Sequence, residues 1–379
     1  MTRSGGAAFF ARALELAERG RYTVSPNPMV GAVVVRGGRI VAEAWHRRAG
    51  GPHAEPAALD RAGRLARGAD LYVTLEPCAH QGRTPPCAPR IASAGIRRVF
   101  VASRDPNPIA SARRGIRELR REGIEVVFAG PDVRRQAERQ NEKFRTWISQ
   151  GRPFVLAKWA ATLDGKTASG TGLSRWITAP KARRRALLFR EEYDAVLVGA
   201  GTVLQDDPRL DRRLGMAAGR PHRRIVLDGR LKVSPEARVF RKPENTVVVT
   251  AVSESHPAAR RLANRGVEVW SIPGPSGRVS IPRVLARLTA EGVTSVMVEG
   301  GSETLWGFFH AGLVDRVAVF GAPIVLGGRT APGGVGGEGF RLGRAVRIGE
   351  VEHERVGNDW LMTGVVAGSG RRMGRDSGR

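Results

Sequence analysis

Two cysteines constrain this chain more than any other feature, because they are the only two it has and they lie close together. Cys78 and Cys87 are nine residues apart, and the tripeptide His53-Ala54-Glu55 precedes them. One imidazole and two thiolates give a tetrahedral zinc ion three protein ligands and leave the fourth place for water, which is the catalytic rather than the structural pattern. The chain is therefore expected to bring His53, Cys78 and Cys87 together around one zinc ion.

Glu55 lies two residues after the expected histidine ligand. In the zinc-deaminase pattern, H-x-E followed by P-C, this glutamate is not a ligand but shuttles protons between the water, the ring nitrogen and the leaving amine. Pro77 stands directly before Cys78, as that pattern requires. Zinc lowers the pKa of its water to about 7. We expect Glu55 to be the catalytic residue of a hydrolytic deaminase.

Two plainer interpretations compete with a zinc site. His-Ala-Glu is a common tripeptide when taken alone, and two cysteines can be small buried hydrophobic residues. The combination of the tripeptide with Pro77 and Cys78, in a predicted helix–strand–helix context, favours catalysis.

The first half of the chain alternates between helix and strand patterns. A hairpin is expected at Gly37-Gly38, between strands 30–35 and 40–44. Such alternation is typical of an α/β fold. The other expected elements are helices 7–19, 54–66, 88–94 and 111–121, and strands 71–75, 99–102 and 125–128.

A second unit is expected after the turn-forming residues 151–153. Two of its segments, 196–208 and 295–306, run from a strand through glycines into a helix, which leaves backbone N–H groups free to hold phosphate. Neither has the G-x-G-x-x-G fingerprint, so a Rossmann domain is not supported. A tight turn is the plainer interpretation of each. The other expected elements are strands 154–158, 225–227, 246–250 and 316–320, and helices 180–190 and 282–290.

The charge balance first suggests a polyanion as partner. The chain has 62 basic and 36 acidic residues, a net charge of +26. The excess is spread evenly, +12 in residues 1–150 and +14 in the rest, and only six of the basic residues are lysines. No motif of interleaved aromatic and basic residues accompanies it, which favours compositional bias and phosphorylated substrates over a nucleic-acid surface. With 26% charged residues and no apolar run near the roughly 18 needed for a span, a membrane protein is not expected.

Three segments of the first half resemble a known family. Residues 26–31 (PNPMVG), 46–55 (HRRAGGPHAE) and 74–87 (TLEPCAHQGRTPPC) are similar to the bifunctional riboflavin-biosynthesis deaminase/reductase family. Most zinc deaminases of nucleosides or tRNA have two residues between their cysteines, whereas eight separate Cys78 from Cys87. The resemblance implies a cytidine-deaminase-like three-layer α/β/α domain. It also implies that the deaminase substrate contacts Asn27, His46, His80, Arg83, Asp105 and Asn107. For Asn27, a simple turn between two prolines is the alternative.

The second half is similar to the reductase part of the same family, at residues 158–166 (KWAATLDGK), 174–178 (SRWIT), 202–208 (TVLQDDP) and 298–301 (VEGG). The resemblance implies a dihydrofolate-reductase-like α/β domain that uses NADPH. The implied cofactor contacts are Ala161, Trp176, Thr202, Asp206, Gly301, Ser302, Glu303, Thr304, Leu305, Trp306 and Gly307. The implied substrate contacts are Lys158, Ser174, Arg190, Leu210, Arg213 and Glu299. For Arg190, a solvated helix face is the alternative. Gly229 departs from the family where relatives carry serine toward the cofactor.

These observations combine into one prediction. We expect a zinc-dependent pyrimidine deaminase domain over residues 1–149, an NADPH-dependent reductase domain over 150–367 and a disordered basic tail over 368–379. By the resemblance, the first domain deaminates 2,5-diamino-6-(5-phosphoribosylamino)pyrimidin-4(3H)-one and the second reduces the ribosyl side chain to ribityl. Lys158 and Asp206 are both candidates for the proton donor of that reduction. The alternative is a nucleic-acid-editing zinc deaminase with a non-catalytic C-terminal domain. We expect a cytoplasmic homo-oligomer that binds a phosphorylated pyrimidine, with no membrane and no specific nucleic acid as partner.

Overall fold

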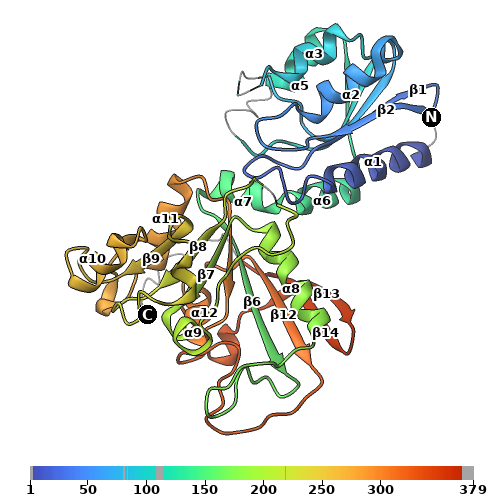
Figure 1. The fold of residues 1–379 in the computed structure, drawn as a ribbon. Helices are drawn as coiled ribbons and strands as arrows, with labels where there is room; N and C mark the ends of the chain where they lie inside the picture. Colours follow the sequence, from blue (N-terminus) through green and yellow to red (C-terminus); the bar gives the residue numbers. More distant parts are fainter. Residues whose placement is uncertain (1–2, 80–81, 83, 108–113, 218, 369–379) are drawn as a thin grey trace, which may run out of the picture. The chain divides into compact units, whose positions relative to one another are not determined.

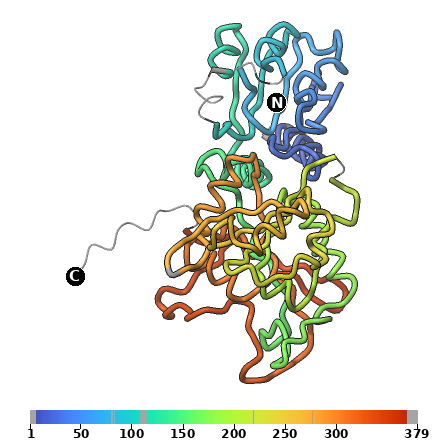
Figure 2. The backbone as a smooth tube through the Cα atoms, turned by 60° about the vertical axis from the view of Figure 1, so that its left-hand side comes forward, coloured from blue at the N-terminus to red at the C-terminus, as the bar shows by residue number. Residues whose placement is uncertain are grey.

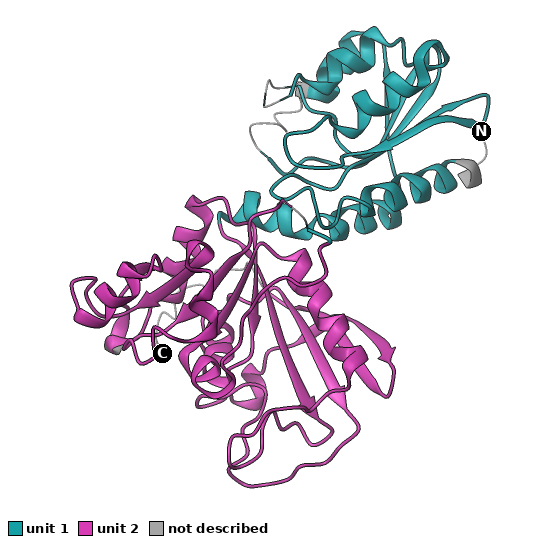
Figure 3. Cartoon of the chain, viewed as in Figure 1, with its two compact units in different colours: residues 1–151, 216–218 teal, residues 152–215, 219–379 magenta. Residues whose placement is uncertain are grey.

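A computed structural model describes residues 3–79, 82, 84–107, 114–217 and 219–368 (Figure 1). His80, Arg83 and residues 369–379, about which the sequence made predictions, lie outside the described residues. The chain forms two compact units (Figure 3), one of Met1–Gly151 with Met216–Ala218 and one of Arg152–Gly215 with Gly219–Arg379. Within the described ranges, no helix has the length and apolar character needed to cross a bilayer.

The first unit contains a five-stranded sheet in the order β2-β1-β3-β4-β5. Strand β1 pairs antiparallel with β2 and β3, whereas β3, β4 and β5 run parallel. Gly37 and Gly38 form the expected hairpin turn, and both have positive φ angles, as a two-residue hairpin loop demands. The strands are β1 (Gly31–Arg36), β2 (Arg39–Trp45), β3 (Asp70–Leu75), β4 (Arg98–Ser103) and β5 (Glu125–Phe128).

Helices cover both faces of this sheet, because the strands are apolar on both sides. Ala32 and Val34 pack with α2 (Ala54–Ala62), α3 (Cys87–Ser93) and α5 (Arg114–Arg121) on one face. Val33 and Val35 pack with α1 (Arg3–Glu18) and α6 (Pro131–Gln140) on the other. A 3₁₀ turn (Gly63–Ala66) extends α2, and α7 (Glu142–Gln150) ends the unit. The unit is a three-layer α/β/α sandwich, as expected.

The second unit contains a nine-stranded sheet in the order β10-β9-β8-β7-β11-β6-β12-β14-β13. All neighbours are parallel except β14, which is antiparallel to β12 and to β13. Figure 2 follows this part of the chain from green to red. The strands are β6 (Phe154–Thr162), β7 (Ala195–Gly199), β8 (Arg223–Leu227), β9 (Thr246–Thr250), β10 (Glu268–Ser271), β11 (Ser295–Glu299), β12 (Arg316–Ala322), β13 (Ile348–Val356) and β14 (Asp359–Val366).

Two layers of helices enclose the parallel part of this sheet. Leu285 of α11 (Ile281–Ala290) and Phe308 of α12 (Ser302–His310) belong to the core on one face. Phe189 of α8 (Pro180–Glu192), Val203 of α9 (Ala200–Asp206) and Leu262 of α10 (Pro257–Asn264) belong to the core on the other. Short 3₁₀ turns occupy Arg238–Arg241, Pro243–Asn245, Pro275–Gly277 and Leu342–Arg344. This is the mixed α/β architecture expected for the second half.

Several elements had no counterpart in the sequence prediction: α6, α7, α10, β10, β13 and β14. The helices α6 and α7 bury almost nothing, since Ala137 is their main contribution to the core. In β13, every residue from Gly349 to Arg355 is exposed, so the strand has no alternation of buried and exposed positions to reveal it.

Candidate active sites

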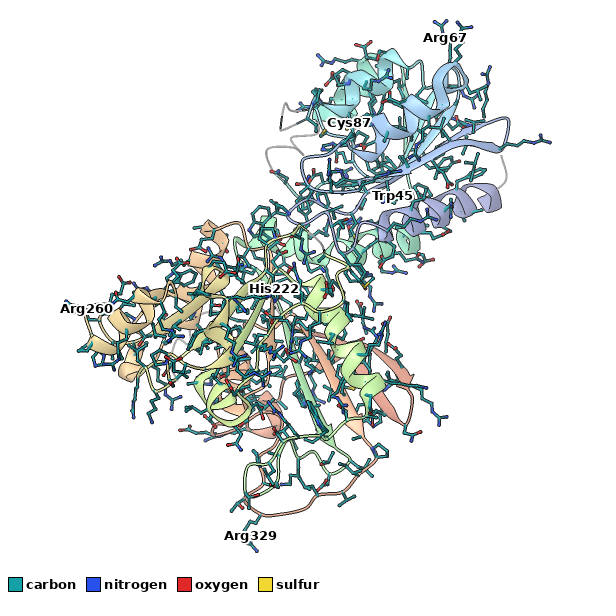
Figure 4. The ribbon with its side chains drawn as sticks, in the orientation of Figure 1. Trp45, Arg67, Cys87, His222, Arg260 and Arg329 are labelled. Carbon is teal, nitrogen blue, oxygen red and sulfur yellow. The ribbon has the colours of Figure 1, made fainter. Side chains whose placement is uncertain are left out.

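Three structural elements of the first unit bring the expected zinc ligands together. His53 is the residue directly before α2, Cys78 follows the end of β3, and Cys87 is the first residue of α3 (labelled in Figure 4). The loop between the cysteines closes on itself, because the backbone N–H groups of Cys87 and Ala88 both donate to the carbonyl of Cys78 at 3.0 Å. These hydrogen bonds hold two thiols that are nine residues apart in the chain next to each other.

The distances between these side chains suit one zinc ion. His53 Nδ1 lies 3.2 Å from Cys87 Sγ and 3.6 Å from Cys78 Sγ. The three candidate donor atoms all lie within 4.8 Å of one another. Two donors bound tetrahedrally to the same zinc ion are about 3.5 to 3.8 Å apart, given bond lengths of about 2.0 and 2.3 Å. The donor set and its spacing therefore fit zinc, with Nδ1 as the histidine donor.

Glu55 lies beside this cluster in the first turn of α2 and is 4% exposed. Burial raises the pKa of its carboxyl to about 7, because the charged form loses its hydration. A carboxyl whose pKa is near neutrality can both take up and release a proton. Glu55 thus has the position and the proton affinity that the deaminase pattern demands.

The environment of Cys78 favours its thiolate form. The Cys87 thiol and the His53 ring lower the pKa of Cys78 well below its usual value, and the backbone N–H of Cys87 contributes as well.

Thr84, for which the sequence made no prediction, contacts the other nitrogen of the His53 ring, with Oγ1 3.1 Å from Nε2. Such an outer contact fixes the orientation of a metal-binding histidine. The only signal for Thr84 was its place in the long loop between the cysteines.

Asn27 and His46 lie next to each other. His46 is 2% exposed, and its Nδ1 lies 2.9 Å from the carbonyl of Pro52, so Nδ1 carries the hydrogen. The other ring nitrogen, Nε2, accepts from Asn27 Nδ2 at 3.0 Å. Burial also lowers the pKa of His46, which keeps the ring neutral. This contact engages the amide nitrogen of Asn27 and fixes the orientation of its side-chain amide beside His46.

The remaining predicted contacts of the deaminase are only partly described. Asp105 and Asn107 follow β4, and Asp105 Oδ1 accepts from the backbone N–H of Asn107 at 2.9 Å. This contact shapes a compact turn. His80 and Arg83 lie outside the described residues.

In the second unit, two glycine-containing turns lie next to each other at the carboxyl ends of central strands. The parallel neighbours β7 and β11 end at Gly199 and Glu299, and Gly199 and Gly300-Gly301 lead directly into α9 and α12. A Cβ atom on Gly199 would lie 2.2 Å from Thr304 Oγ1, and one on Gly301 would lie 3.1 Å from Thr202 Oγ1. Gly300 and Gly301 also have positive φ angles. Glycine is therefore favoured at these turns. Two helices begin there beyond the strand ends, and backbone N–H groups in such a place can hold phosphate.

A buried charge cluster lies beside these turns. Lys158 Nζ is 3.1 Å from Glu299 Oε1, and the Arg190 guanidinium is 2.6 Å from Glu299 Oε2. Burial by itself would raise the pKa of Glu299, but the two cations outweigh it and lower the pKa to about 2. Arg190 also donates to the carbonyl of Asp211 at 3.2 Å. Arg190 is only 8% exposed, so it does not lie on a solvated helix face.

The other predicted contacts of the reductase lie on several segments of the second unit. Ser174 Oγ donates to Asp206 Oδ1 at 2.6 Å. Trp176 is exposed, and the Arg183 guanidinium lies 4.3 Å from the centre of its ring. Leu210 is buried with a φ angle of +56°, and Arg213 next to this loop is exposed. The remaining ones lie on β6 or along α12: Ala161, Ser302, Glu303, Leu305, Trp306 and Gly307.

Gly229, the departure from the family pattern, follows β8. The nearest atom to a Cβ placed there is a methyl of Val279 at 3.8 Å. Space is therefore available for a serine side chain, and the glycine is not required by packing.

Two families match the two halves of the chain. The profile of the "cytidine and deoxycytidylate deaminase zinc-binding region" matches residues 5–103, and that of the "RibD C-terminal domain" matches residues 153–362. The riboflavin biosynthesis protein RibD of Aquifex aeolicus is 42% identical over 350 residues, covering 92% of this chain and 95% of that protein. RibD of Bacillus amyloliquefaciens is 43% identical, with 93% and 94% covered.

Solved structures agree with these matches. RibD of Acinetobacter baumannii superimposes with a TM-score of 0.85 at 33% identity, covering 96% of this chain and 99% of that chain. The diaminohydroxyphosphoribosylaminopyrimidine deaminase/5-amino-6-(5-phosphoribosylamino)uracil reductase of Thermotoga maritima gives a TM-score of 0.82 at 37% identity, with the same shares covered. The similarity extends over both units.

Proposed function

Because this chain belongs to the RibD family of bifunctional deaminases and reductases of riboflavin biosynthesis, we propose that its first unit deaminates 2,5-diamino-6-(5-phosphoribosylamino)pyrimidin-4(3H)-one and that its second unit reduces the ribosyl side chain of the product to ribityl. The observation that carries the deaminase proposal is the buried carboxyl of Glu55 beside three donor atoms spaced for zinc. For the reductase it is the Lys158–Glu299–Arg190 cluster beside two glycine turns.

In the deamination, His53, Cys78 and Cys87 would hold zinc, which when bound supplies a water acidified to a pKa of about 7. Glu55 takes the first proton from the attacking water and passes it to the ring nitrogen. It then takes the second proton from the same oxygen and delivers it to the leaving amine, so that the C–N bond breaks and ammonia leaves. These transfers need a group that gains and loses a proton near pH 7, and burial gives Glu55 that property.

Asn27 has a positioning part in this proposal. Its amide nitrogen is held by His46, so its amide oxygen can accept a hydrogen bond from an amino group of the pyrimidine. The hydrogen bond from the backbone N–H of Asn107 to the Asp105 carboxylate likewise presents a preformed turn to the substrate. His80 and Arg83 complete the proposed contacts.

In the reduction, NADPH supplies a hydride for C1 of the sugar when it is bound. The glycine turns and α12 would hold its phosphates, with Thr202, Asp206 and Trp176 as further contacts. We assign Lys158 as the proton donor rather than Asp206. Lys158 Nζ is a donor group held by Glu299, whereas Asp206 Oδ1 already accepts a hydrogen bond from Ser174.

The substrate's phosphate needs cations at the second site as well. Arg190 and Arg213 are proposed to bind it, since a guanidinium can donate two parallel hydrogen bonds to phosphate. Ser174, Leu210 and Glu299 complete the proposed substrate contacts.

One assay separates this proposal from a nucleic-acid-editing deaminase. The net charge of +26 is the observation that favours editing. Zinc-loaded protein is given the free pyrimidine nucleotide or an RNA oligonucleotide, and ammonia release is measured. We expect release from the nucleotide alone, together with NADPH oxidation when the deaminated product is supplied. Release from the RNA alone would overturn the proposal.

Location and assembly are also part of the proposal. We propose that the protein acts in the cytoplasm as a homo-oligomer. Light scattering of the purified protein tests the assembly, and a monomer at micromolar concentration would contradict it.

A further inference from the structure

We propose that Asn141 is a positioning residue of the deaminase site, which holds the loop that carries Asn27 in the shape that binds the substrate. This role rests on the proposed deamination. Asn141 lies between α6 and α7, far along the chain from the motifs that identify the site, and its exposed fraction is 4%.

The side chain of Asn141 makes two hydrogen bonds to one distant residue. Its Oδ1 accepts from the backbone N–H of Met29 at 2.7 Å, and its Nδ2 donates to the carbonyl of Met29 at 2.9 Å. The two residues are 112 positions apart in the chain. Only a side chain with a donor and an acceptor side by side can satisfy both groups of one backbone residue in this way.

The side chain of Asn141 does not cap the helix that follows it. Asparagine at the start of a helix commonly caps it, by accepting from a backbone N–H of the first turn. Asn141 occupies that place before α7, yet its side chain makes no capping hydrogen bond. An amide buried to this extent is costly unless its hydrogen bonds are made, and here Met29 supplies both partners.

Met29 lies between two residues that contact His46. Asn27, two residues before it, donates to His46 Nε2 at 3.0 Å. Val30, the residue after it, accepts from the backbone N–H of His46 at 2.9 Å. Asn141 therefore clamps the middle of a segment that is attached to His46 at both sides.

The contacts continue from His46 to the metal cluster. His46 Nδ1 donates to Pro52, the residue before the zinc ligand His53. The rings of His46 and His53 meet edge to face, with centroids 5.5 Å apart. Releasing Met29 would thus shift Asn27 relative to a histidine that is itself fixed by the metal site.

Gln140 is a matched control, because it is the neighbouring residue and makes the same number of hydrogen bonds. Its Nε2 donates to the carbonyl of Leu14 at 2.9 Å and to Glu18 at 2.7 Å. These contacts join α6 to α1 and do not involve the Asn27 loop. Gln140→Ala therefore removes comparable hydrogen bonds at the adjacent position without removing the contact between Asn141 and Met29.

The experiment compares zinc-loaded full-length wild type, Asn141→Ala, Asn141→Asp and Gln140→Ala. Asn141→Asp keeps the size and the acceptor but loses the donor to Met29. The measurements are KM and kcat of ammonia release, zinc content, reductase turnover with the deaminated product, and hydrogen exchange of the backbone around Met29.

We expect both Asn141 variants to raise KM for deamination by about 10- to 100-fold, the range of effects for a misplacement of about 1 Å. Zinc content and reductase turnover should stay unchanged, and the Met29 amide should exchange faster. Gln140→Ala should leave KM and the exchange of Met29 as in the wild type.

Two results would overturn the role of Asn141. One is an unchanged KM in both Asn141 variants, and the other is an equal rise of KM in Gln140→Ala, which would reduce the effect to general destabilisation. A wild-type protein that releases no ammonia from the pyrimidine nucleotide would instead overturn the proposed deamination, and this role with it.

Discussion

Lys158 and Glu299 are direct partners in the register of two neighbouring parallel strands, β6 and β11, and their side chains form a 3.1 Å ion pair at the carboxyl end of the sheet. Arg190 reaches the same carboxylate from α8. The three groups come from segments that are far apart in the chain. The sheet register thus creates a cluster in which one carboxylate orients two cations, and this cluster is the basis of the proposed reductase site.

Removal of Arg190 should weaken substrate binding at the reductase site. A lost charge-assisted contact costs about 1.5–3 kcal/mol, so Arg190→Ala is expected to lower substrate affinity roughly 10- to 100-fold. The measurement is the KM and kcat of NADPH oxidation with the deaminated product. Arg185→Ala is the control, since Arg185 lies on the same helix in a more exposed ion pair with Glu354. Equal values for wild type and Arg190→Ala would show that this buried arginine has only a structural role.

The two chemistries should be separable by single substitutions. Glu55→Gln keeps the size of the side chain but removes the proton acceptor, and general acid–base groups contribute about 10²–10⁴-fold. Ammonia release should fall by that factor, while zinc stays bound and NADPH oxidation persists. Asp206→Asn should show the reverse, because it removes the charge beside Ser174 and Arg175.

Parallel assays of both half-reactions on both variants provide the measurement. If folded, zinc-loaded Glu55→Gln protein loses both activities together, the two-site arrangement is wrong and a shared site must replace it.

The zinc site should bind one ion per chain. Its affinity for zinc should fall more when a ligand is removed than when a contact to a ligand is removed. Cys87→Ser removes a ligand, so tightly held zinc should be lost. Thr84→Val removes only the contact to His53 Nε2, and such outer contacts are worth about 10- to 100-fold in metal affinity. Metal analysis after dialysis against a chelator tests both variants. Full retention of zinc by Cys87→Ser would refute the three-ligand assignment.

The stability of the metal-free protein should depend on pH through Glu55. Its pKa is about 7 in the folded protein, against 4.5 as its ordinary value. Between these pH values the native state holds a proton that the unfolded chain has released, so the free energy of unfolding falls as the pH rises from about 4.5 to about 7. The contribution is on the order of 3 kcal/mol, at about 1.4 kcal/mol per pKa unit.

Urea denaturation of metal-free wild type and Glu55→Gln across this pH range measures that dependence. The variant should lose part of the downward slope, and added zinc should also reduce it in the wild type, because a nearby cation favours the carboxylate. Identical slopes in wild type and variant would contradict the assigned environment of Glu55.

Much of the zinc site could be predicted from the chain alone. His53, Glu55, Cys78 and Cys87 stand at spacings that only a few chemistries use, and the strand that precedes Cys78 is a short apolar run. These signals are local in the sequence, so they can be recognised without knowledge of the fold. Elements without a local signal were missed, as β13 shows, since its residues are almost all exposed.

The contacts between distant segments were decided by the tertiary structure. From its sequence context alone, Arg190 could be a cation on a solvated helix face, yet packing buries its side chain against Glu299. Asn141 precedes a helix that the sequence did not reveal, and its side chain holds Met29, 112 positions away. The physical reason is the same in both cases. Periodicity and spacing depend on neighbours along the chain, whereas the partner of a buried polar group depends on which segments the folded core brings within hydrogen-bond distance.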